Sequence, residues 1–175
     1  MHRLMFVPHA VVGAALLSSC TVPVAALAGI GVDVDGNLVG YVRVCDESID
    51  GTTLYYDVSS RGATVPTSVE VGRWEAQPPV EATAEWSLNA PEGGWTSSKP
   101  VEPLEPGREY TLYGWTKDNT VSASGVTFTL ADVAALKPGQ VLHWSGRSGG
   151  KPERDVNEVS SRTDFEAKAC RIIRL

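Results

Sequence analysis

One short motif in the chain has the residue types of a catalytic site. Residues Gly146 to Gly150 read G-R-S-G-G and match the G-x-S-x-G pattern of a serine nucleophile placed between a strand and a helix. That chemistry also needs a later histidine, whereas His143 precedes the serine and Pro152 would break a following helix. Since glycine and serine are typical of loops, we interpret the motif as a loop and do not expect a serine hydrolase.

The chain offers few residues for metal or cofactor chemistry. His143 is the only histidine after the first thirty residues, so we expect a structural, partly buried side chain beside Trp144. Asp33 and Asp35 suggest a calcium loop, but Gly36 comes too early for that pattern and the required bidentate glutamate is missing. We therefore expect no enzymatic activity, no cofactor and no metal.

Two aromatic residues are better candidates for function. Strand periodicity over Arg108–Lys117 places Tyr113 and Trp115 on one face and Tyr110 on the other. Aromatic rings on the solvent face of a sheet require either a cover or a ligand, and a glycan, a peptide or a protein would suit them because planar rings offer area at little entropic cost. The alternative is that Val141–Trp144 covers them. Tyr113 and Trp115 are thus the candidate binding face.

The hairpin that carries these rings is the clearest fold signal. Arg108–Lys117 and Val121–Leu130 are rich in β-forming residues and flank a polar turn. Alternation places Trp86 in the core. The other predicted strands are Gly29–Asp35, Leu38–Cys45, Gly51–Val58, Val69–Ala76 (closed by Pro78-Pro79) and Ala82–Leu88. About seven short strands predict an all-β, two-sheet immunoglobulin-like or fibronectin type III-like sandwich.

The remaining segments predict connections and a C-terminal extension. Residues 89–104 lack periodicity and indicate a long loop between sheets, and Ala131–Leu136 indicates one or two helical turns. We expect the sandwich domain to span residues 20–144. Residues 145–175 would then form a mobile loop, to about Ser161, and a C-terminal segment tied back to the domain.

The string L-E-P-G-R-E-Y, from Leu104 to Tyr110, resembles the corner before the sixth strand of fibronectin type III domains. The resemblance implies that the Tyr110 hydroxyl bonds to backbone a few residues upstream. It also implies a turn at Pro106 and Gly107, with Leu104 packed beneath the tyrosine.

The N-terminus has the pattern of an export signal. Arg3 is followed by a run from Leu4 to Val32 without Asp, Glu, Lys or Arg, which is long enough to span a bilayer if it were retained. The net charge of −6 and the pI near 5.0 argue against nucleic acid and against electrostatic binding to an anionic membrane. Cleavage after Ala28, at an A-x-A site, would instead release a soluble secreted protein.

Leu17-Ser18-Ser19-Cys20 resembles the lipobox of bacterial lipoproteins. The resemblance implies a signal peptide over residues 1–19, cleavage before Cys20 and a diacylglyceryl group on its thiol. Each buried CH₂ contributes about 0.8 kcal/mol, and two acyl chains are enough for stable anchoring. The lipid would then hold the protein on the extracytoplasmic face of the cell membrane.

Two cysteines remain once Cys20 is lipidated or removed. Cys45 and Cys170 are an even number of thiols in an oxidising compartment, so we expect them to pair. The bridge would close a loop of about 125 residues, worth about 4 to 5 kcal/mol in the chain-entropy description. The alternative is two buried free thiols.

Taken together, these motifs resemble those of small lipoproteins of high-GC Gram-positive bacteria. The shared features are the lipobox, V-D-x-D-G-N, the early cysteine, I-D-G-T-T-L-Y, L-x-P-G-x-x-Y-x-L-Y-G-W-T-K-D-N and the late cysteine. The resemblance implies a position at the outer leaflet and no known activity. We expect a non-enzymatic module that binds an envelope protein or a glycan, or alternatively a structural or accessory subunit of an envelope complex.

Overall fold

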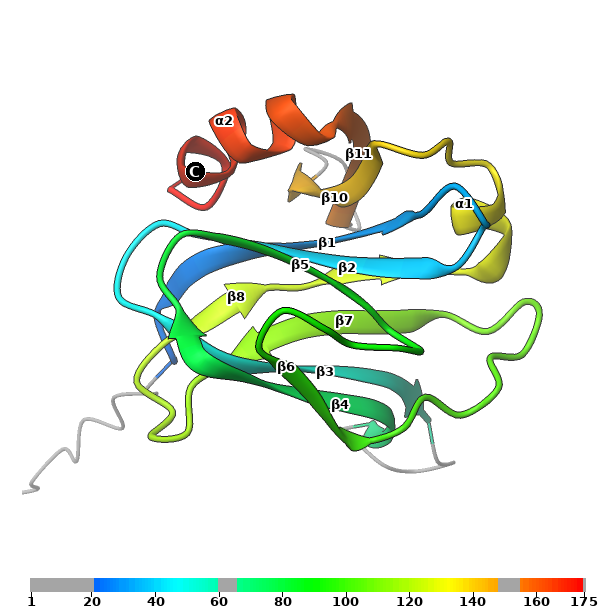
Figure 1. Cartoon of the computed structure of the whole chain (residues 1–175), viewed down its shortest axis with the longest axis horizontal. Helices are drawn as coiled ribbons and strands as arrows, with labels where there is room; N and C mark the ends of the chain where they lie inside the picture. The colour runs from blue at the N-terminus through cyan, green and yellow to red at the C-terminus, as the bar shows by residue number, and fades with distance from the viewer. Residues whose placement is uncertain (1–20, 60–65, 148–154, 175) are drawn as a thin grey trace, which may run out of the picture.

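The computed structural model describes residues 21–59, 66–147 and 155–174, which form a predominantly β fold with two layers (Figure 1). The first layer contains, in spatial order, β5 (Thr83–Ser87), β2 (Leu38–Val44), β1 (Val24–Val32), β10 (Gln140–Arg147) and β11 (Asp155–Ser161). The second contains β6 (Trp95–Lys99), β4 (Thr67–Val80), β3 (Ile49–Val58), β7 (Tyr110–Trp115) and β9 (Val126–Phe128). The all-β class is confirmed.

Strand β8 (Ser122–Ser124) joins the two layers along one edge. It pairs in parallel with the N-terminal half of β1 and antiparallel with Trp115 at the end of β7. Hydrogen bonding is therefore continuous around that edge, and the eleven strands of the described residues form one sheet that is nearly closed like a barrel. The expected number of about seven strands was too small.

Side chains from alternate positions of both layers fill a common interior. The fully buried members include Ala26, Ala28 and Ile30 from β1, Val42 from β2, Leu54 from β3, Trp74 from β4 and Leu112 from β7. Alternation is retained because one face of each strand is removed from water.

A tryptophan cluster holds the two layers together at the opposite edge. The ring of Trp86 on β5 stacks on that of Trp95 on β6, with centroids 4.2 Å apart. The indole N–H of Trp74 donates to the carbonyl of Leu88 at 3.1 Å. Gly40 makes room for this cluster, because a Cβ there would lie 2.3 Å from Cζ2 of Trp86. The prediction that Trp86 is a core residue is confirmed.

Two predictions about the region from β4 to β6 were wrong. Pro78 and Pro79 do not end the fourth strand, which continues to Val80. The pairing of β3 with β4 skips from Glu75 to Val80, so neither proline has to donate a hydrogen bond to β3. The loop expected over residues 89–104 contains β6, in which only Trp95 is buried, so no alternating pattern marks it.

The predicted helical turn is present as α1 (Leu130–Ala134). The hydroxyl of Thr129 accepts from the backbone N–H of Asp132, and the Asp132 carboxylate accepts from the backbone N–H of Thr129. This capping box satisfies the first free donors of the helix. The hairpin before α1 has the predicted polar tip, with the N–H of Asn119 donating to the Thr116 carbonyl. Its second strand, expected to be unbroken over Val121–Leu130, is instead divided into β8 and β9, and Leu130 already belongs to α1.

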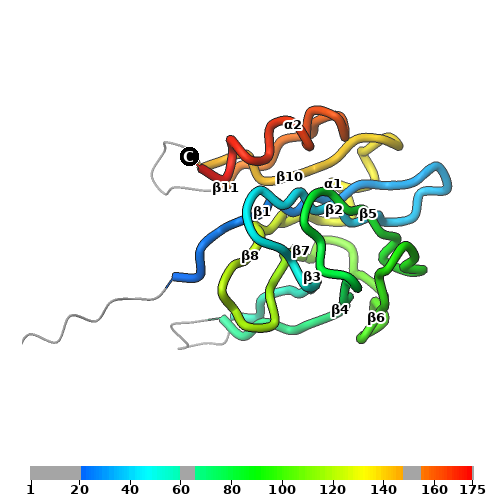
Figure 2. The backbone as a smooth tube through the Cα atoms, turned by 60° about the vertical axis from the view of Figure 1, so that its left-hand side comes forward, coloured from blue at the N-terminus to red at the C-terminus, as the bar shows by residue number. Residues whose placement is uncertain are grey.

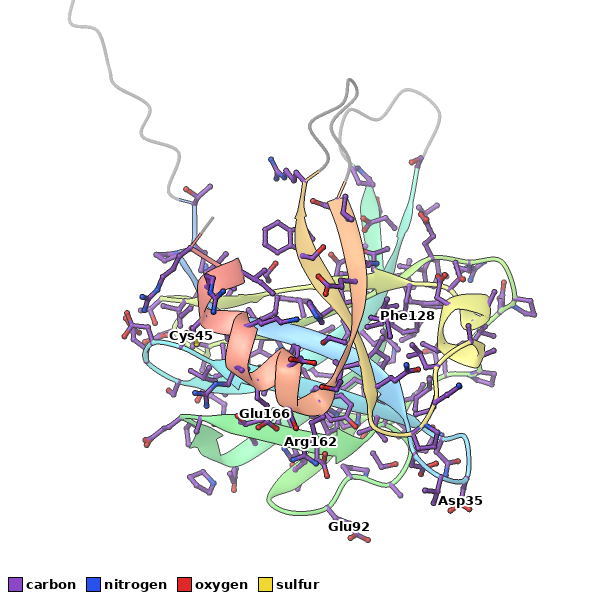
Figure 3. All side chains as sticks on the ribbon, turned by 90° about the horizontal axis from the view of Figure 1, so that it is seen from above. Asp35, Cys45, Glu92, Phe128, Arg162 and Glu166 are labelled. Atoms are coloured by element: carbon purple, nitrogen blue, oxygen red, sulfur yellow. A yellow bond between two sulfur atoms is a disulfide. The ribbon has the colours of Figure 1, made fainter. Side chains whose placement is uncertain are left out.

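The C-terminal extension is more regular than predicted. Strand β10 runs through Arg147 and pairs with β11, so most of the loop expected from Ser145 to Ser161 is a pair of strands, apart from residues outside the described ranges. Helix α2 (Arg162–Ile172) follows and lies on the outside of the first layer, away from β3 and β4 (Figures 1 and 2). Arg162 and Glu166 lie on the part of α2 nearest its start (Figure 3).

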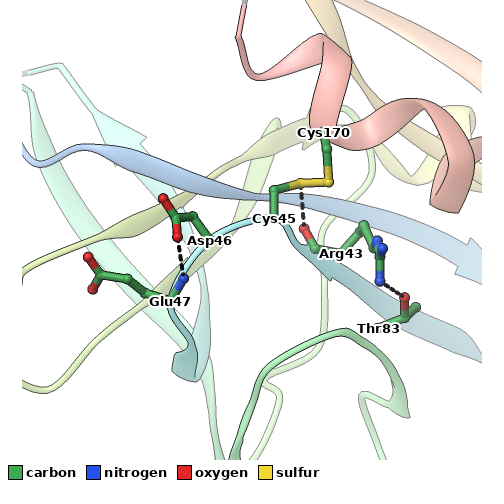
Figure 4. Close-up of a disulfide and its surroundings, with 6 residues drawn as sticks. All are labelled: Arg43, Cys45, Asp46, Glu47, Thr83 and Cys170. Carbon is green, nitrogen blue, oxygen red and sulfur yellow. Dashed lines mark hydrogen bonds between the residues drawn. A yellow bond between two sulfur atoms is a disulfide. The ribbon is translucent and has the colours of Figure 1, made fainter.

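The apolar face of α2 forms a second, smaller core against the first layer. Phe165, Ala169 and Ile172 pack on Leu27 of β1, Tyr41 of β2 and Val141 of β10. The predicted disulfide is present: the sulfur atoms of Cys45 and Cys170 are 2.05 Å apart, which fastens the end of β2 to α2 (Figure 4).

Candidate functional site

The outer face of β3, β4 and β7 carries the candidate residues. Strand pairing aligns Arg73 of β4, Thr53 of β3 and Tyr113 of β7 in one row across the sheet. The next row consists of Glu75, Gly51 and Trp115. These side chains point away from the core because the alternate positions, such as Leu54 and Leu112, point into it. We call this surface the outer groove face.

Trp115 forms the floor of the outer groove face. Gly51 opposite has no side chain, and a Cβ there would lie 2.5 Å from Cζ2 of the indole ring. The indole N–H donates to the Thr53 hydroxyl at 2.9 Å, and the guanidinium of Arg73 lies 4.3 Å above the ring. Trp115 is consequently only 8% exposed. The cover is Arg73, whereas the segment expected to cover it, Val141–Trp144, belongs to the other layer.

Tyr113 is the more accessible aromatic of the pair. Its ring is half-buried and meets the ring of Tyr55 edge-on, with centroids 5.6 Å apart. Burial raises the pKa of Tyr55 above its ordinary value, because it disfavours the phenolate. The two tyrosines thus combine apolar ring surface with hydrogen-bonding hydroxyls.

Two shallow hollows meet at Tyr113. One, of about 330 Å³, is lined by Thr53, Tyr55, Ser68, Glu70 and Tyr113. The other, also of about 330 Å³, is lined by Arg73, Glu75, Tyr113, Trp115, Thr116, Lys117 and Asn119. Volumes of this order are at the lower end of the range for small-ligand sites. Tyr113 lies between the two hollows on the same face.

The charged side chains of the outer groove face are paired. Nη1 of Arg73 lies 3.1 Å from Oε2 of Glu70, and Nζ of Lys117 lies 3.2 Å from Oε2 of Glu75. The face therefore carries two carboxylates and two cations side by side. Such half-exposed ion pairs contribute little to the free energy of unfolding. Their side chains line the two hollows.

The corner residues fix the start of β7. The Tyr110 hydroxyl accepts a hydrogen bond from the backbone N–H of Glu105 at 2.8 Å, and Tyr110 is 1% exposed. Gly107 has φ of +77°, which suits the turn after Pro106, and Leu104 packs against the main core. This is the geometry that the corner motif implies, and it positions β7 rather than contacting the hollows.

His143 has a structural environment. It is fully buried in the first layer, with Nδ1 2.8 Å from the Trp144 carbonyl and Nε2 3.0 Å from the Ser160 hydroxyl. A carbonyl only accepts, so Nδ1 carries the hydrogen. The imidazole centroid also lies 5.4 Å from that of Phe165 on α2, so this histidine ties β10 to β11 and to the helix.

Several predicted residues lie elsewhere or outside the described ranges. Cys20 and Ser148 both fall outside residues 21–59, 66–147 and 155–174. Within those ranges no three His, Cys, Asp or Glu side chains are grouped to hold a metal ion. None of the described helices has the length and apolar character needed to cross a bilayer.

The sequence pattern did not identify the residues of β3 and β4 that complete the outer groove face. Arg73, Glu70 and Tyr55 become neighbours of Tyr113 only through strand pairing between distant segments. One available signal was Gly51 within an otherwise β-forming run, since such a glycine often marks the close approach of another group.

Comparison of the chain with family models, with curated proteins and with solved structures gave no match.

Proposed function

We propose that this protein is a lipid-anchored envelope protein whose folded domain binds an envelope component through the outer groove face, without catalysing a reaction. The observation that carries the proposal is Tyr113, a half-buried ring between two hollows lined with paired charges and hydroxyl groups. Concave sites with a few convergent polar groups around aromatic surface are typical of ligand binding.

The position of β1 supports cleavage before Cys20 rather than after Ala28. Cleavage after Ala28 would remove Val24–Ala28, five of the nine residues of β1. This half of the strand includes Leu27, which is fully buried, and it pairs with β2 and β8. Cleavage before Cys20 leaves the whole strand intact.

The disulfide supports export. A bond between Cys45 and Cys170 is stable in an oxidising compartment, and such bonds are rare in the cytosol of mesophiles. With the domain beginning at β1, only Thr21, Val22 and Pro23 separate Cys20 from the folded strands. The lipid would hold the domain close to the membrane surface.

The pairing pattern supports assignment to the immunoglobulin-like or fibronectin type III-like sandwiches. In chain order, β1, β2 and β5 pair in one layer as the A, B and E strands of such domains do. In the other layer β3 pairs with β7, and β7 with β8 and β9, as the C, F and G strands do. The corner at Tyr110 lies at the start of the F equivalent.

Metabolic labelling with palmitate tests the anchor. We expect wild-type protein to take up label and to fractionate with membranes, and Cys20→Ala to lose both properties. Retention of label by Cys20→Ala, or absence of label in the wild type, would contradict the lipid assignment.

Site-specific photocrosslinking in intact cells tests the binding face. A photoreactive residue at Ser68, which is exposed beside the first hollow, is expected to give a discrete adduct with an envelope component. The same residue at exposed Val34, in the β1–β2 turn, serves as the control. Equal adducts at both positions, or none at Ser68, would contradict the proposal.

The second candidate function is a structural or accessory subunit, and the burial of Trp115 under Arg73 favours it. In that case Arg73 only completes the packing of the sheet face. Arg73→Ala would then lower stability, and no discrete adduct would form at Ser68 in either the wild type or the variant.

A further inference from the structure

We infer that the outer groove face binds a neutral oligosaccharide, with successive sugar residues lying on either side of Tyr113. This inference rests on the proposed function and specifies the chemical class of its ligand. It is carried by the charge balance, the lining chemistry and the arrangement of the two hollows along β7.

The charges of the outer groove face are balanced, so the face does not favour a strongly charged ligand. Each cation has a carboxylate beside it, Arg73 with Glu70 and Lys117 with Glu75. A polyanion such as a nucleic acid needs clustered, unneutralised cations, and the whole chain carries a net charge of −6. A cationic ligand would meet Arg73 and Lys117 as well as the acids. A neutral ligand is repelled neither by the carboxylates nor by the cations.

The lining chemistry matches a sugar. A sugar ring has faces of C–H groups and a rim of hydroxyls that both donate and accept hydrogen bonds. The ring of Tyr113 offers a flat apolar surface, and Glu70, Arg73 and Asn119 offer acceptors and donors around it. Charged partners make stronger hydrogen bonds to hydroxyls than neutral partners do. An apolar ligand would leave these polar groups desolvated.

The geometry favours more than one sugar residue. Tyr113 lies near the middle of β7, with Thr111 towards one end of the strand and Trp115 towards the other. The first hollow extends from Tyr113 towards Tyr55 and Ser68, and the second towards Trp115 and Lys117. An oligosaccharide lying along β7 would therefore occupy both hollows, each of which has a volume of about 330 Å³.

Arg73 connects the two hollows. It touches the Trp115 ring on one side and pairs with Glu70 on the other, so a bound sugar hydroxyl can bond to both members of the pair without breaking the contact over the indole. Trp115 is also held in place by its hydrogen bond to Thr53. A preformed site loses less conformational entropy on binding.

The test uses the full-length lipoprotein in detergent. It is first applied to an array of neutral and acidic oligosaccharides, and the best neutral binder, together with cellotetraose, chitotetraose and maltotetraose, is then titrated by calorimetry. We expect binding of at least one neutral oligosaccharide, at least tenfold weaker binding of its monosaccharide, and little change between low and high salt.

Matched aromatic variants give the decisive comparison. Tyr113→Ala is expected to weaken binding at least tenfold while leaving the circular dichroism spectrum unchanged, and Tyr113→Phe to retain most of the affinity. Trp144→Ala removes a half-buried aromatic from the other layer and is expected to bind like the wild type. Equal losses in Tyr113→Ala and Trp144→Ala would overturn the inference, as would binding confined to acidic oligosaccharides.

Failure of the inference is distinguishable from failure of the proposed function. If no neutral oligosaccharide binds but the Ser68 adduct still forms in cells, the ligand is not a neutral sugar and the proposed binding face stands. If neither the array nor the crosslink gives a signal, both are wrong.

Discussion

Gly51 determines where Trp115 lies. Cross-strand neighbours of a large aromatic normally carry side chains that keep it upright, but Gly51 leaves the sheet surface open, so the indole lies against β3 and reaches Arg73 on β4. The strand loses intrinsic stability through this glycine. The open space at Gly51 lets the Trp115 indole pack against β3 beneath Arg73.

Replacement of Gly51 by alanine is expected to destabilise the fold. The new Cβ would lie 2.5 Å from both the indole Cζ2 of Trp115 and the backbone oxygen of Trp74, so a strand must move. We expect a decrease of about 1 to 3 kcal/mol or more in the free energy of unfolding, measured by urea denaturation. Gly107→Ala is the control: nothing lies within 4 Å there, and only its positive φ costs about 1 kcal/mol. Equal effects would contradict the crowding argument.

The hydroxyl of Tyr110 is expected to stabilise the corner. Tyr110→Phe keeps the ring and leaves the backbone N–H of Glu105 without its acceptor, at a cost of about 1 to 2 kcal/mol. Tyr56→Phe is the matched control. The ring of Tyr56 meets the ring of Tyr110 edge-on, but the Tyr56 hydroxyl has no hydrogen-bond partner among the described residues. Thermal unfolding of both variants is the measurement, and a larger effect in Tyr56→Phe would be inconsistent with this role of the corner.

Among the strands, β1 is paired along both edges and buried on both faces. It pairs with β2 along one edge, and along the other with β8 in its first half and β10 in its second. Its side chains enter both cores: Ala26, Ala28 and Ile30 face the main core, and Leu27 faces α2. Its apolar, small-residue sequence follows from this burial on both faces.

Loss of half of β1 is expected to prevent folding. A chain beginning at Gly29 lacks the residues that pair with β8 and the buried side chain of Leu27. A chain beginning at Thr21 retains both and is expected to give a cooperative thermal transition. Circular dichroism and amide exchange distinguish the two. A cooperative transition for the shorter chain would contradict the argument and reopen cleavage after Ala28.

For the whole molecule, the bond between Cys45 and Cys170 joins the sandwich to the C-terminal helix. Helix α2 has eleven residues, a length at which isolated helices are marginal in water. Its stability must come from the contacts of Phe165, Ala169 and Ile172 and from the covalent link. The disulfide thus keeps the small core closed.

Removal of the disulfide is expected to loosen α2 before the sandwich. The double variant Cys45→Ser, Cys170→Ser should lose up to about 4 to 5 kcal/mol of unfolding free energy. Hydrogen exchange should rise first over Arg162–Ile172, whereas β3 and β7 should keep their protection. The wild type under oxidising conditions is the reference. Equal loss of protection in α2 and β7 would show that the helix is not a separately opening unit.

The sequence was sufficient for features that depend on local pattern. Alternation identified β5 with Trp86 inside, the corner motif located Tyr110, and an even number of remaining thiols predicted the bond between Cys45 and Cys170. It failed for β6, where Trp95 is the only buried residue, and for the bulge that lets β4 continue past Pro79. The formation of β6 and the bulge in β4 depend on pairing with another strand more than on the β propensity of the local sequence.

The sequence by itself therefore determined the all-β class, the hairpin that carries Tyr113 and Trp115, and the pairing of the two cysteines. Only the tertiary structure decided that Arg73 of β4 covers Trp115 and that Glu70 and Lys117 belong to the same face. The physical reason is that strand alternation is a property of consecutive residues. The composition of the outer groove face is instead set by hydrogen-bond register between strands that are far apart in the chain.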